Sequence, residues 1–341
     1  MGVKLSGLIE PRTIRLDDLS GRIIAIDAFN MLYQFLATIR GPDGTPLKTR
    51  DGRVSSHLVG LFSRTANFLE KDIKPVFIFD GKPPELKRAE QERRRELRAS
   101  AQESYERAEQ EQDIEAMKKY ASRLSRLTEE MVEDAKRLIR AFGLPVVQAA
   151  SEGEAYAAQL VREGKAYASA SEDFDSLLFG SPRLIRQLSV TGRRRKSRRL
   201  GTFIVQPEII SLEAMLNTLN LDQDQLIVLG ILIGTDFNVG GVHGIGPKKA
   251  LKLIAKHGHD FDSLFNEAGY AHEVRWQEIF GFFKNPPETV EDSISFSAPD
   301  RDRLRALLVD EFEFSEQKIR SFFEKLDAND TGQRSLGSYF G

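Results

Sequence analysis

Two pairs of carboxylates stand close together in this sequence, each pair separated by one residue. Glu152 and Glu154 occur in "ASEGEAYAAQ", which reads as the start of an alanine-rich helix, and Asp173 and Asp175 follow in "SEDFDSLLFG". The neighbours of both pairs are small or apolar, which is typical of buried positions. Three further aspartates stand where a strand or an apolar helix is expected to end: Asp27, Asp80 and Asp236.

The chemistry that so many acids could do depends on cations. Carboxylates crowded into a small volume cannot all ionise alone, because like charges a few Å apart raise each other's pKa. Mg²⁺ accepts a few carboxylates while keeping waters, and two ions about 4 Å apart could activate water and stabilise the leaving oxygen of a phosphodiester displacement. No histidine or cysteine is placed as a ligand, which argues against zinc. Ordinary caps and surface acids remain the alternative for any single position, but not for the set.

Strands and helices alternate around these acids. "GRIIAID" and "KPVFIFD" are predicted strands that end at Asp27 and Asp80, and "KAYASASED" and "TFIVQPE" are weaker candidates. Helical periodicities lie between them, so we expect an α/β fold with a mostly parallel central sheet flanked by helices. Ligands gather at the carboxyl ends of such strands. Ser151 and Glu154 also have the spacing of a capping box, so capping alone is the alternative role of Glu154.

The composition limits the class of protein. The chain has 341 residues, no cysteine and a net charge of −2, which fits a soluble intracellular protein of the cytoplasm. Residues 82–130 are almost uninterrupted charged and polar helix formers, so they form a solvated helical insertion or a mobile segment. "RRRKSRR", residues 193–199, is a basic loop between two strands that tracks DNA, or a solvated turn.

A glycine-rich turn, "GVHGIGPKKA", follows the apolar run that ends near Asp236. Gly244 and Gly246 allow a tight turn whose backbone N–H groups can face a phosphate. Lys248 and Lys249 add positive charge at the start of the next helix. Such a hairpin between helices can hold a duplex backbone without reading its sequence. A plain helix-turn-helix linker is the alternative.

Taken in order, these blocks resemble the flap endonucleases of archaeal type, within the structure-specific 5′-nuclease superfamily. The blocks are "IAIDAFNMLYQFL", "VFIFDGKPPELK", "ASEGEAYAAQL", "SEDFDSLLFG", "LIGTDF" and "GVHGIGPKKA", and they extend over essentially the whole chain. The resemblance implies two Mg²⁺ ions per site, with Mn²⁺ as a substitute, and a K⁺ ion at the hairpin. It implies that the metal-binding acids are Asp27, Asp80, Glu152, Glu154, Asp173, Asp175 and Asp236.

The resemblance also implies roles for basic and aromatic residues. Lys87 and Arg94 match cations that the family directs at the scissile phosphate, within a helical arch (residues 81–130) that passes the 5′ flap. Tyr33 matches an aromatic that stacks on a base, although the apolar run "MLYQFL" by itself favours a core aromatic. Arg40 and Arg64 match family residues near DNA.

The end of the sequence, "GQRSLGSYFG", resembles a sliding-clamp-binding box. Gln333, Leu336, Tyr339 and Phe340 have its spacing, and one short helical turn would bring the apolar three to one side. A tail that folds back on its own domain is the alternative. We therefore expect one nuclease domain, residues 1–326, with a helix-hairpin-helix element at 222–257, and a flexible tail at 327–341 that binds the clamp.

These observations lead to one expected function and several rivals. We expect a metal-dependent 5′ flap endonuclease with 5′–3′ exonuclease activity, acting in Okazaki fragment maturation and DNA repair on branched DNA. A related 5′-nuclease for gaps, bubbles or junctions is an alternative. A phosphatase with Asp173 as nucleophile and Asp175 as acid leaves the other acids unexplained. A non-catalytic, clamp-associated DNA-binding protein is the alternative outside enzymes.

Overall fold

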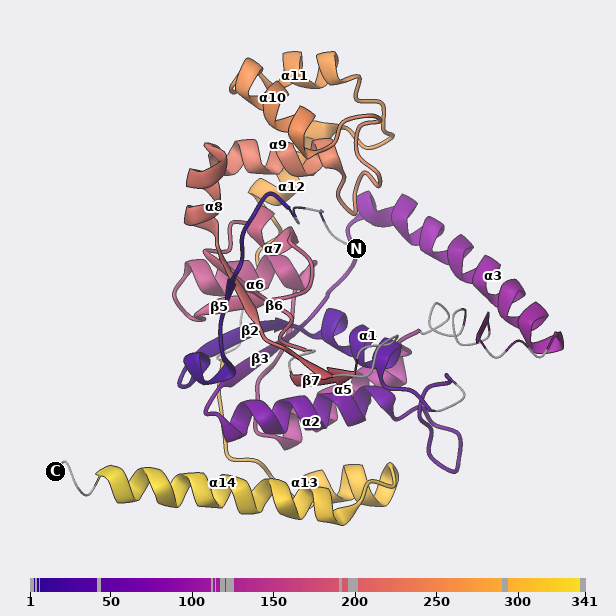
Figure 1. Ribbon diagram of the computed structural model, residues 1–341, viewed down its shortest axis with the longest axis vertical. Coiled ribbons are helices and arrows are strands. Elements are labelled where there is room, and N and C mark those ends of the chain that lie inside the picture. Colours follow the sequence, from indigo (N-terminus) through magenta and orange to yellow (C-terminus); the bar gives the residue numbers. More distant parts are fainter. Residues whose placement is uncertain are drawn as a thin grey trace.

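A seven-stranded sheet with helices on both faces forms the centre of the molecule (Figure 1). This computed structural model describes every residue except 1, 2, 4, 6, 42, 43, 112, 114, 117–119, 121–125, 190, 191, 196–201, 290–293 and 338–341. Among the residues described, no helix is both long and apolar enough to cross a membrane.

The sheet is mostly parallel, as the sequence predicted. Its strand order is β1-β9-β6-β5-β2-β3-β4, and only the pairings of β9 with β1 and β6 are antiparallel. The two aspartate-ended runs are the neighbours β2 (Ile23–Asp27) and β3 (Lys74–Phe79). The other strands are β1 (Arg12–Thr13), β4 (Val146–Gln148), β5 (Ala168–Ala170), β6 (Arg183–Arg186) and β9 (Glu208–Ser211).

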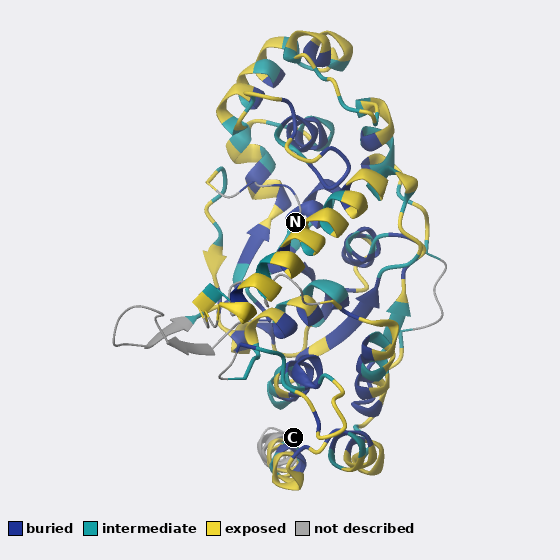
Figure 2. Ribbon diagram, turned by 90° about the vertical axis from the view of Figure 1, so that its right-hand side faces the viewer, coloured by how far each residue is buried: buried dark blue, intermediate teal, exposed yellow. Residues whose placement is uncertain are grey.

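Alternation along the central strands divides the core between two faces. In β2, Ile24 and Ile26 join the cluster under one set of helices, while Ala25 joins the cluster on the opposite face. Figure 2 shows these strands as buried and the outer sides of the helices as exposed. The first face is covered by η1 (Leu16–Leu19), α1 (Ala28–Thr38), α2 (Ser56–Glu70) and α5 (Glu129–Ala141), and the second by α6 (Gly153–Arg162).

A second group of helices packs beyond the end of the sheet, around α9, and is labelled at the top of Figure 1. From Leu226 to Leu232, α9 is apolar on all sides and buried, which explains why its sequence shows no amphipathic pattern. The group comprises α7 (Asp175–Leu178), α8 (Leu212–Leu219), α9 (Gln223–Ile233), α10 (Pro247–His257), α11 (Phe261–Ala268) and α12 (Trp276–Lys284).

The charged insertion begins with η2 (Glu85–Lys87) and continues as α3 (Arg88–Gln110). α3 extends away from the sheet in Figure 1, and only Glu90, Ala101 and Ala108 of its residues are buried. The prediction of a solvated helical insertion is confirmed for this part of residues 82–130. A two-stranded sheet pairs β7 (Gly192–Arg195) with β8 (Thr202–Val205), so the first basic residues of "RRRKSRR" belong to a strand.

The C-terminal region packs under α2 and α5 through α13 (Arg301–Arg305), the π-helical turn η3 (Ala306–Glu311) and α14 (Glu316–Gly337). α14 continues past residue 327, where a flexible tail was expected to begin. Contacts with α2 explain the difference: Leu326 packs against the main core, and the Asn329 side chain donates to the carbonyl of Glu70 at 2.8 Å.

Candidate active site

The seven predicted acids come together at the carboxyl edge of the sheet. Asp27 is the last residue of β2, Asp80 directly follows β3, and Asp173 lies in the loop after β5. These three strands are neighbours in the order β5-β2-β3, so parallel pairing brings their ends together. The remaining four lie at or near helix ends: Glu152 and Glu154 at the start of α6, Asp175 at the start of α7 and Asp236 after α9.

We call these seven residues the acid cluster. Burial and mutual repulsion raise the pKa values of five of them: Asp27, Asp80, Glu152, Glu154 and Asp175. Burial raises the pKa of Asp27 to about 8, with the charge of Asp80 adding to it. Burial, followed by the charge of Asp236, raises the pKa of Asp175 to about 7. The pKa of Glu154 lies well above its ordinary value, first through burial and then through Asp175. Without nearby cations, therefore, the acids of the cluster cannot all be ionised at the same time.

The start of α6 is built differently from the predicted capping box. The helix is preceded by Glu152 as N-cap, and the backbone N–H of Gly153 donates to Oδ1 of Asp80 at 2.7 Å. The capping role predicted for Ser151 is wrong, because its hydroxyl is buried with no hydrogen-bond partner among the described residues and its carbonyl accepts from the N–H of Gly81 at 2.6 Å. The capping carboxylate is therefore that of Asp80, which directly follows β3. This bond fixes the position of the start of α6 relative to the end of that strand.

Gly81 lets these two segments approach. A Cβ at this position would lie 2.0 Å from the carbonyl oxygen of Ala149, so no other residue fits without moving the backbone. The two chain segments that carry Asp80 and Glu152 can therefore lie in direct contact.

A buried polar turn places Asp236. The hydroxyl of Thr235 donates to Oδ1 of Asn238 at 2.7 Å, and the Asn238 amide donates to the carbonyl of Ile231 at 2.7 Å. The second bond gives a partner to the Ile231 carbonyl in the last turn of α9, where carbonyls have none within the helix. The chain therefore leaves α9 in a fixed direction, with Asp236 toward the other acids.

Lys87 and Arg94 lie among the acids, as the sequence predicted. The Lys87 ammonium donates to Oε2 of Glu152 and lies 3.6 Å from Oδ2 of Asp236. Burial alone would lower the pKa of Lys87, but the charges of Glu152 and Asp236 outweigh it and raise that pKa. Arg94 donates to the same Oδ2 of Asp236 at 2.8 Å. The base of α3 thus brings two cations to the acid cluster.

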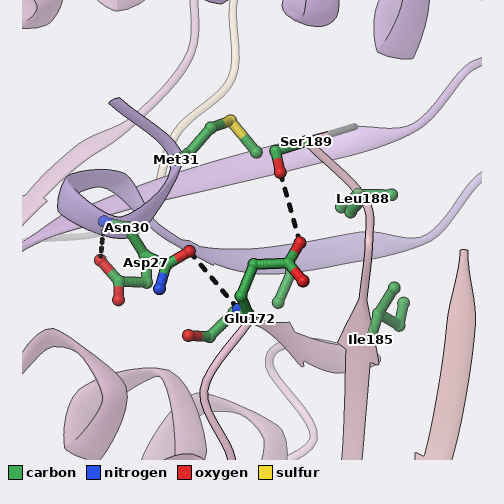
Figure 3. A pocket seen from close by; sticks show the side chains of 9 residues that line it. Asp27, Asn30, Met31, Glu172, Ile185, Leu188 and Ser189 are labelled. Atoms are coloured by element: carbon green, nitrogen blue, oxygen red, sulfur yellow. Dashed lines mark hydrogen bonds between the residues drawn. The ribbon is translucent and has the colours of Figure 1, made fainter. Parts of the chain in front are cut away.

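Two positioning contacts were missed by sequence reasoning. The buried N–H of Val3 donates to Oδ1 of Asp175 at 2.8 Å. Asn30 donates through its backbone to Asp27 at 3.0 Å and through its side-chain amide to Asp173 at 3.3 Å. Figure 3 shows the Asn30 side chain between Asp27 and Glu172. An amide three residues after Asp27, in the first turn of a mostly apolar helix, is the signal that the sequence offered.

The donor set fits hard divalent cations. Every candidate ligand is a carboxylate, and Oε1 of Glu154 is buried with no hydrogen-bond partner among the residues described. Among the residues that the structure describes, no three Asp, Glu or His side chains are already arranged so that they could hold a metal ion. Lys87 and Arg94 supply counter-charge in this arrangement, so binding of a cation requires these side chains to adjust.

The glycine-rich turn lies between α9 and α10, so the predicted hairpin between helices is present. Gly244 adopts a φ of +73°, which favours glycine, and Gly246 is the N-cap residue of α10. Lys248 and Lys249 are exposed in the first turn, and Lys249 donates to the carbonyl of Gly244 at 2.9 Å. Positive charge and a helix N-terminus thus face solvent together, which suits an anionic ligand.

The remaining predicted residues lie on α1, just after it, on α2 and on or after α14. Tyr33 is 41% exposed on α1, so its interpretation as a core aromatic is wrong. Arg40 donates to the carbonyls of Ala37 and Gly44, and Arg64 is half-buried on α2. For the clamp box, Gln333 and Leu336 belong to the backbone of α14. Tyr339 and Phe340 lie outside the described residues.

Comparisons with known proteins agree with this arrangement. Residues 1–101 match the XPG N-terminal domain and residues 143–236 the XPG I-region. Flap endonuclease 1 of Aeropyrum pernix is 48% identical over 330 residues, which cover 96% of this chain and 94% of the relative.

Solved structures agree as well. Flap endonuclease-1 from Methanococcus jannaschii has a TM-score of 0.74 at 38% identity, with 95% and 98% of the two chains covered. A structure of the Holliday junction-resolving enzyme GEN1 with product DNA and Mg²⁺ shares the fold, with a TM-score of 0.58, 19% identity and coverage of 94% and 75%.

Proposed function

The chain belongs to the flap endonuclease 1 family, and from that premise we propose that it hydrolyses one phosphodiester bond near the junction of a 5′ flap with duplex DNA. The observation that carries this proposal is the acid cluster at the sheet edge, contacted by Lys87 and Arg94 from the base of α3. The proposal includes 5′–3′ exonuclease activity and a place in Okazaki fragment maturation and DNA repair.

The XPG-type nucleases are metal-dependent, and the acid cluster is our candidate for that site. We propose two Mg²⁺ ions per site, with Mn²⁺ as a substitute, held by the seven acids. When bound, such ions supply the Lewis-acid polarisation of the scissile phosphate. The absence of cysteine and the all-carboxylate donor set support this choice over zinc.

The chain's own cations have a separate task in this proposal. Lys87 and Arg94 reach the acid cluster from the arch. The ammonium of Lys87 is paired with Glu152, and the guanidinium of Arg94 is paired with Asp236. A scissile phosphate that enters between arch and acids would meet both cations, which offset the negative charge that grows in the transition state. Removing either is expected to lower the rate of cleavage far more than the affinity for DNA.

We propose that the duplex is held by the hairpin (residues 244–249) through backbone N–H groups and the exposed side chains of Lys248 and Lys249. The resemblance adds a K⁺ ion bound there by backbone carbonyls. The exposed ring of Tyr33 is available to stack on a base beside the cut, and we assign Arg40 and Arg64 to the nearby DNA backbone. Changing both lysines to alanine should reduce the slope of log affinity against log salt by about 2.

A sliding clamp is the proposed protein partner, bound through Gln333, Leu336, Tyr339 and Phe340. Support comes from the sequence pattern, and the extent of α14 puts the first two residues on a helix. Titration of the full chain with a purified clamp tests this. Phe340→Ala should abolish binding while cleavage of free flap DNA continues, and binding that persists in this variant would refute the assignment.

A labelled duplex with a 5′ flap tests the central proposal. Cleavage should require Mg²⁺ or Mn²⁺, stop in EDTA, and stop in Asp173→Ala while that variant still binds the flap. Asp310→Ala is the matched control, since Asp310 is an exposed aspartate paired with Arg305 on the opposite side of the core, and it should cleave normally. Full cleavage in EDTA would refute the metal-dependent mechanism, and cleavage by Asp173→Ala would refute the site.

A further inference from the structure

Glu90 is a buried carboxylate in a helix that is otherwise almost entirely solvated. It lies on the first turn of α3, its side chain is 2% exposed, and it is not one of the seven acids. A lone buried carboxylate on such a helix would be costly, because a charge taken out of water must be compensated by partners. Its surroundings therefore indicate what it does.

Two arginines of the same helix saturate this carboxylate. Arg93 donates through Nε to Oε2 at 2.7 Å and through its terminal nitrogen to Oε1 at 3.0 Å. Arg94 donates through Nε to Oε1 at 2.6 Å. Burial would raise the pKa of Glu90, but these bonds outweigh it and the pKa lies below its ordinary value, so the group stays ionised at neutral pH.

The far end of Arg94 reaches the acid cluster. Its terminal nitrogen donates to Oδ2 of Asp236 at 2.8 Å, so its guanidinium is held at both ends by charged acceptors. These two bonds use two of the five N–H groups of the guanidinium, and the others can meet a phosphate. A long side chain on a solvated helix would otherwise explore many rotamers, whereas this one is fixed in advance.

We propose that Glu90 is a positioning residue that orients Arg94 for the transferring phosphate. The inference rests on the proposed nuclease function and adds a residue to the same site. Displacing a catalytic group by about 1 Å can cost up to a hundredfold in rate, so Glu90→Ala should slow single-turnover cleavage about tenfold to a hundredfold. The affinity for flap DNA, measured by anisotropy in Ca²⁺, should stay within about twofold, because the Glu90 side chain is buried and offers DNA no surface of its own.

Glu92→Ala is the matched control. Glu92 is the same residue type on the same helix, but its side chain is 63% exposed and its ion pair with Arg88 spans 3.9 Å. It should cleave within about twofold of the wild type. Glu90→Gln keeps an acceptor without the charge and should lie between the wild type and Glu90→Ala.

A double-mutant cycle separates orientation from general structural support. If Glu90 acts through Arg94, adding Glu90→Ala to Arg94→Ala should slow cleavage no further. The inference is overturned if the two losses multiply, if Glu90→Ala cleaves as fast as the wild type or faster, or if the loss falls on affinity instead of rate. A wild-type protein that leaves flaps uncut would refute the proposed function itself, which is a different result from any of these.

Discussion

Lys87 is expected to stabilise the metal-free fold as well as to serve the reaction. Its ammonium contacts Glu152 and lies 3.6 Å from Asp236, while its side chain is only 19% exposed. Lys87→Met leaves both carboxylates without that partner. Breaking a fully buried ion pair costs 3–5 kcal/mol, and the residual exposure lowers our expectation to about 2–4 kcal/mol. For a chain of 341 residues the melting temperature shifts by about 1.4 °C per kcal/mol, so it should fall by about 3–6 °C.

The loss of stability in Lys87→Met should depend on metal, because divalent cations bound to the same acids would replace the missing positive charge. Thermal unfolding of wild type and Lys87→Met, each in EDTA and in saturating Mg²⁺, measures this directly. The difference in melting temperature should be large in EDTA and should shrink by at least half in Mg²⁺. Lys82→Met is the control, since Lys82 is exposed at the start of the same insertion and should change stability by less than about 0.5 kcal/mol. Equal losses with and without Mg²⁺, or none in EDTA, would refute the reasoning.

Three further predictions concern buried groups around the site. Burial lowers the pKa of His57 to about 4 from 6.5, so the unfolded chain alone gains this proton as the pH falls from 6.5 to 4. The free energy of unfolding should therefore fall by up to about 3 kcal/mol in the wild type, and this loss should be absent in His57→Leu. Urea unfolding of both proteins at pH 7 and 4.5 measures it, and the same pH dependence in both would contradict the prediction. Asn30→Ala should weaken Mn²⁺ binding about tenfold to a hundredfold by releasing Asp27 and Asp173, as read by electron paramagnetic resonance, and unchanged affinity would exclude that role. Val3→Pro removes the amide donor to Asp175 and should slow cleavage, whereas Val3→Ile keeps the donor and should not.

The sequence predicted the sheet and the acid cluster well, because both rest on local patterns. A β-branched run that ends in aspartate specifies a strand and the edge that it reaches, so Asp27 and Asp80 could be placed without coordinates. Parallel pairing of β4 with β3 and of β5 with β2 then brought the pairs at Glu152 and Asp173 to the same edge. The resemblance directed Lys87 and Arg94 at the scissile phosphate. Both contact acids of the cluster in the structure, and their role at the phosphate stays a prediction.

The errors came from contacts between distant segments. Ser151 has the spacing of a cap, but the strand-end Asp80 takes that role across the fold. Tyr33 stands in an apolar run, yet its position on α1 faces solvent, which a one-dimensional pattern cannot show. The helix after residue 326 depends on contacts with α2, and Glu90 looked like one more charge in a solvated run. In each case a contact between distant segments outweighed the preference indicated by the local sequence.

The positions of the seven acids along the chain have a consequence during protein synthesis. Asp27 and Asp80 precede the arch, the other acids follow it, and Asp236 completes the cluster only after more than two-thirds of the chain. A nascent or truncated chain that stops within the arch contains Lys87 and Arg94 but only two of the acids. If the seven acids form the metal site as we propose, cleavage requires the late segments, and unfinished molecules should not cut nucleic acid. The same division makes the arch a natural place to split the enzyme into two inactive fragments whose reassembly could be followed by the return of cutting.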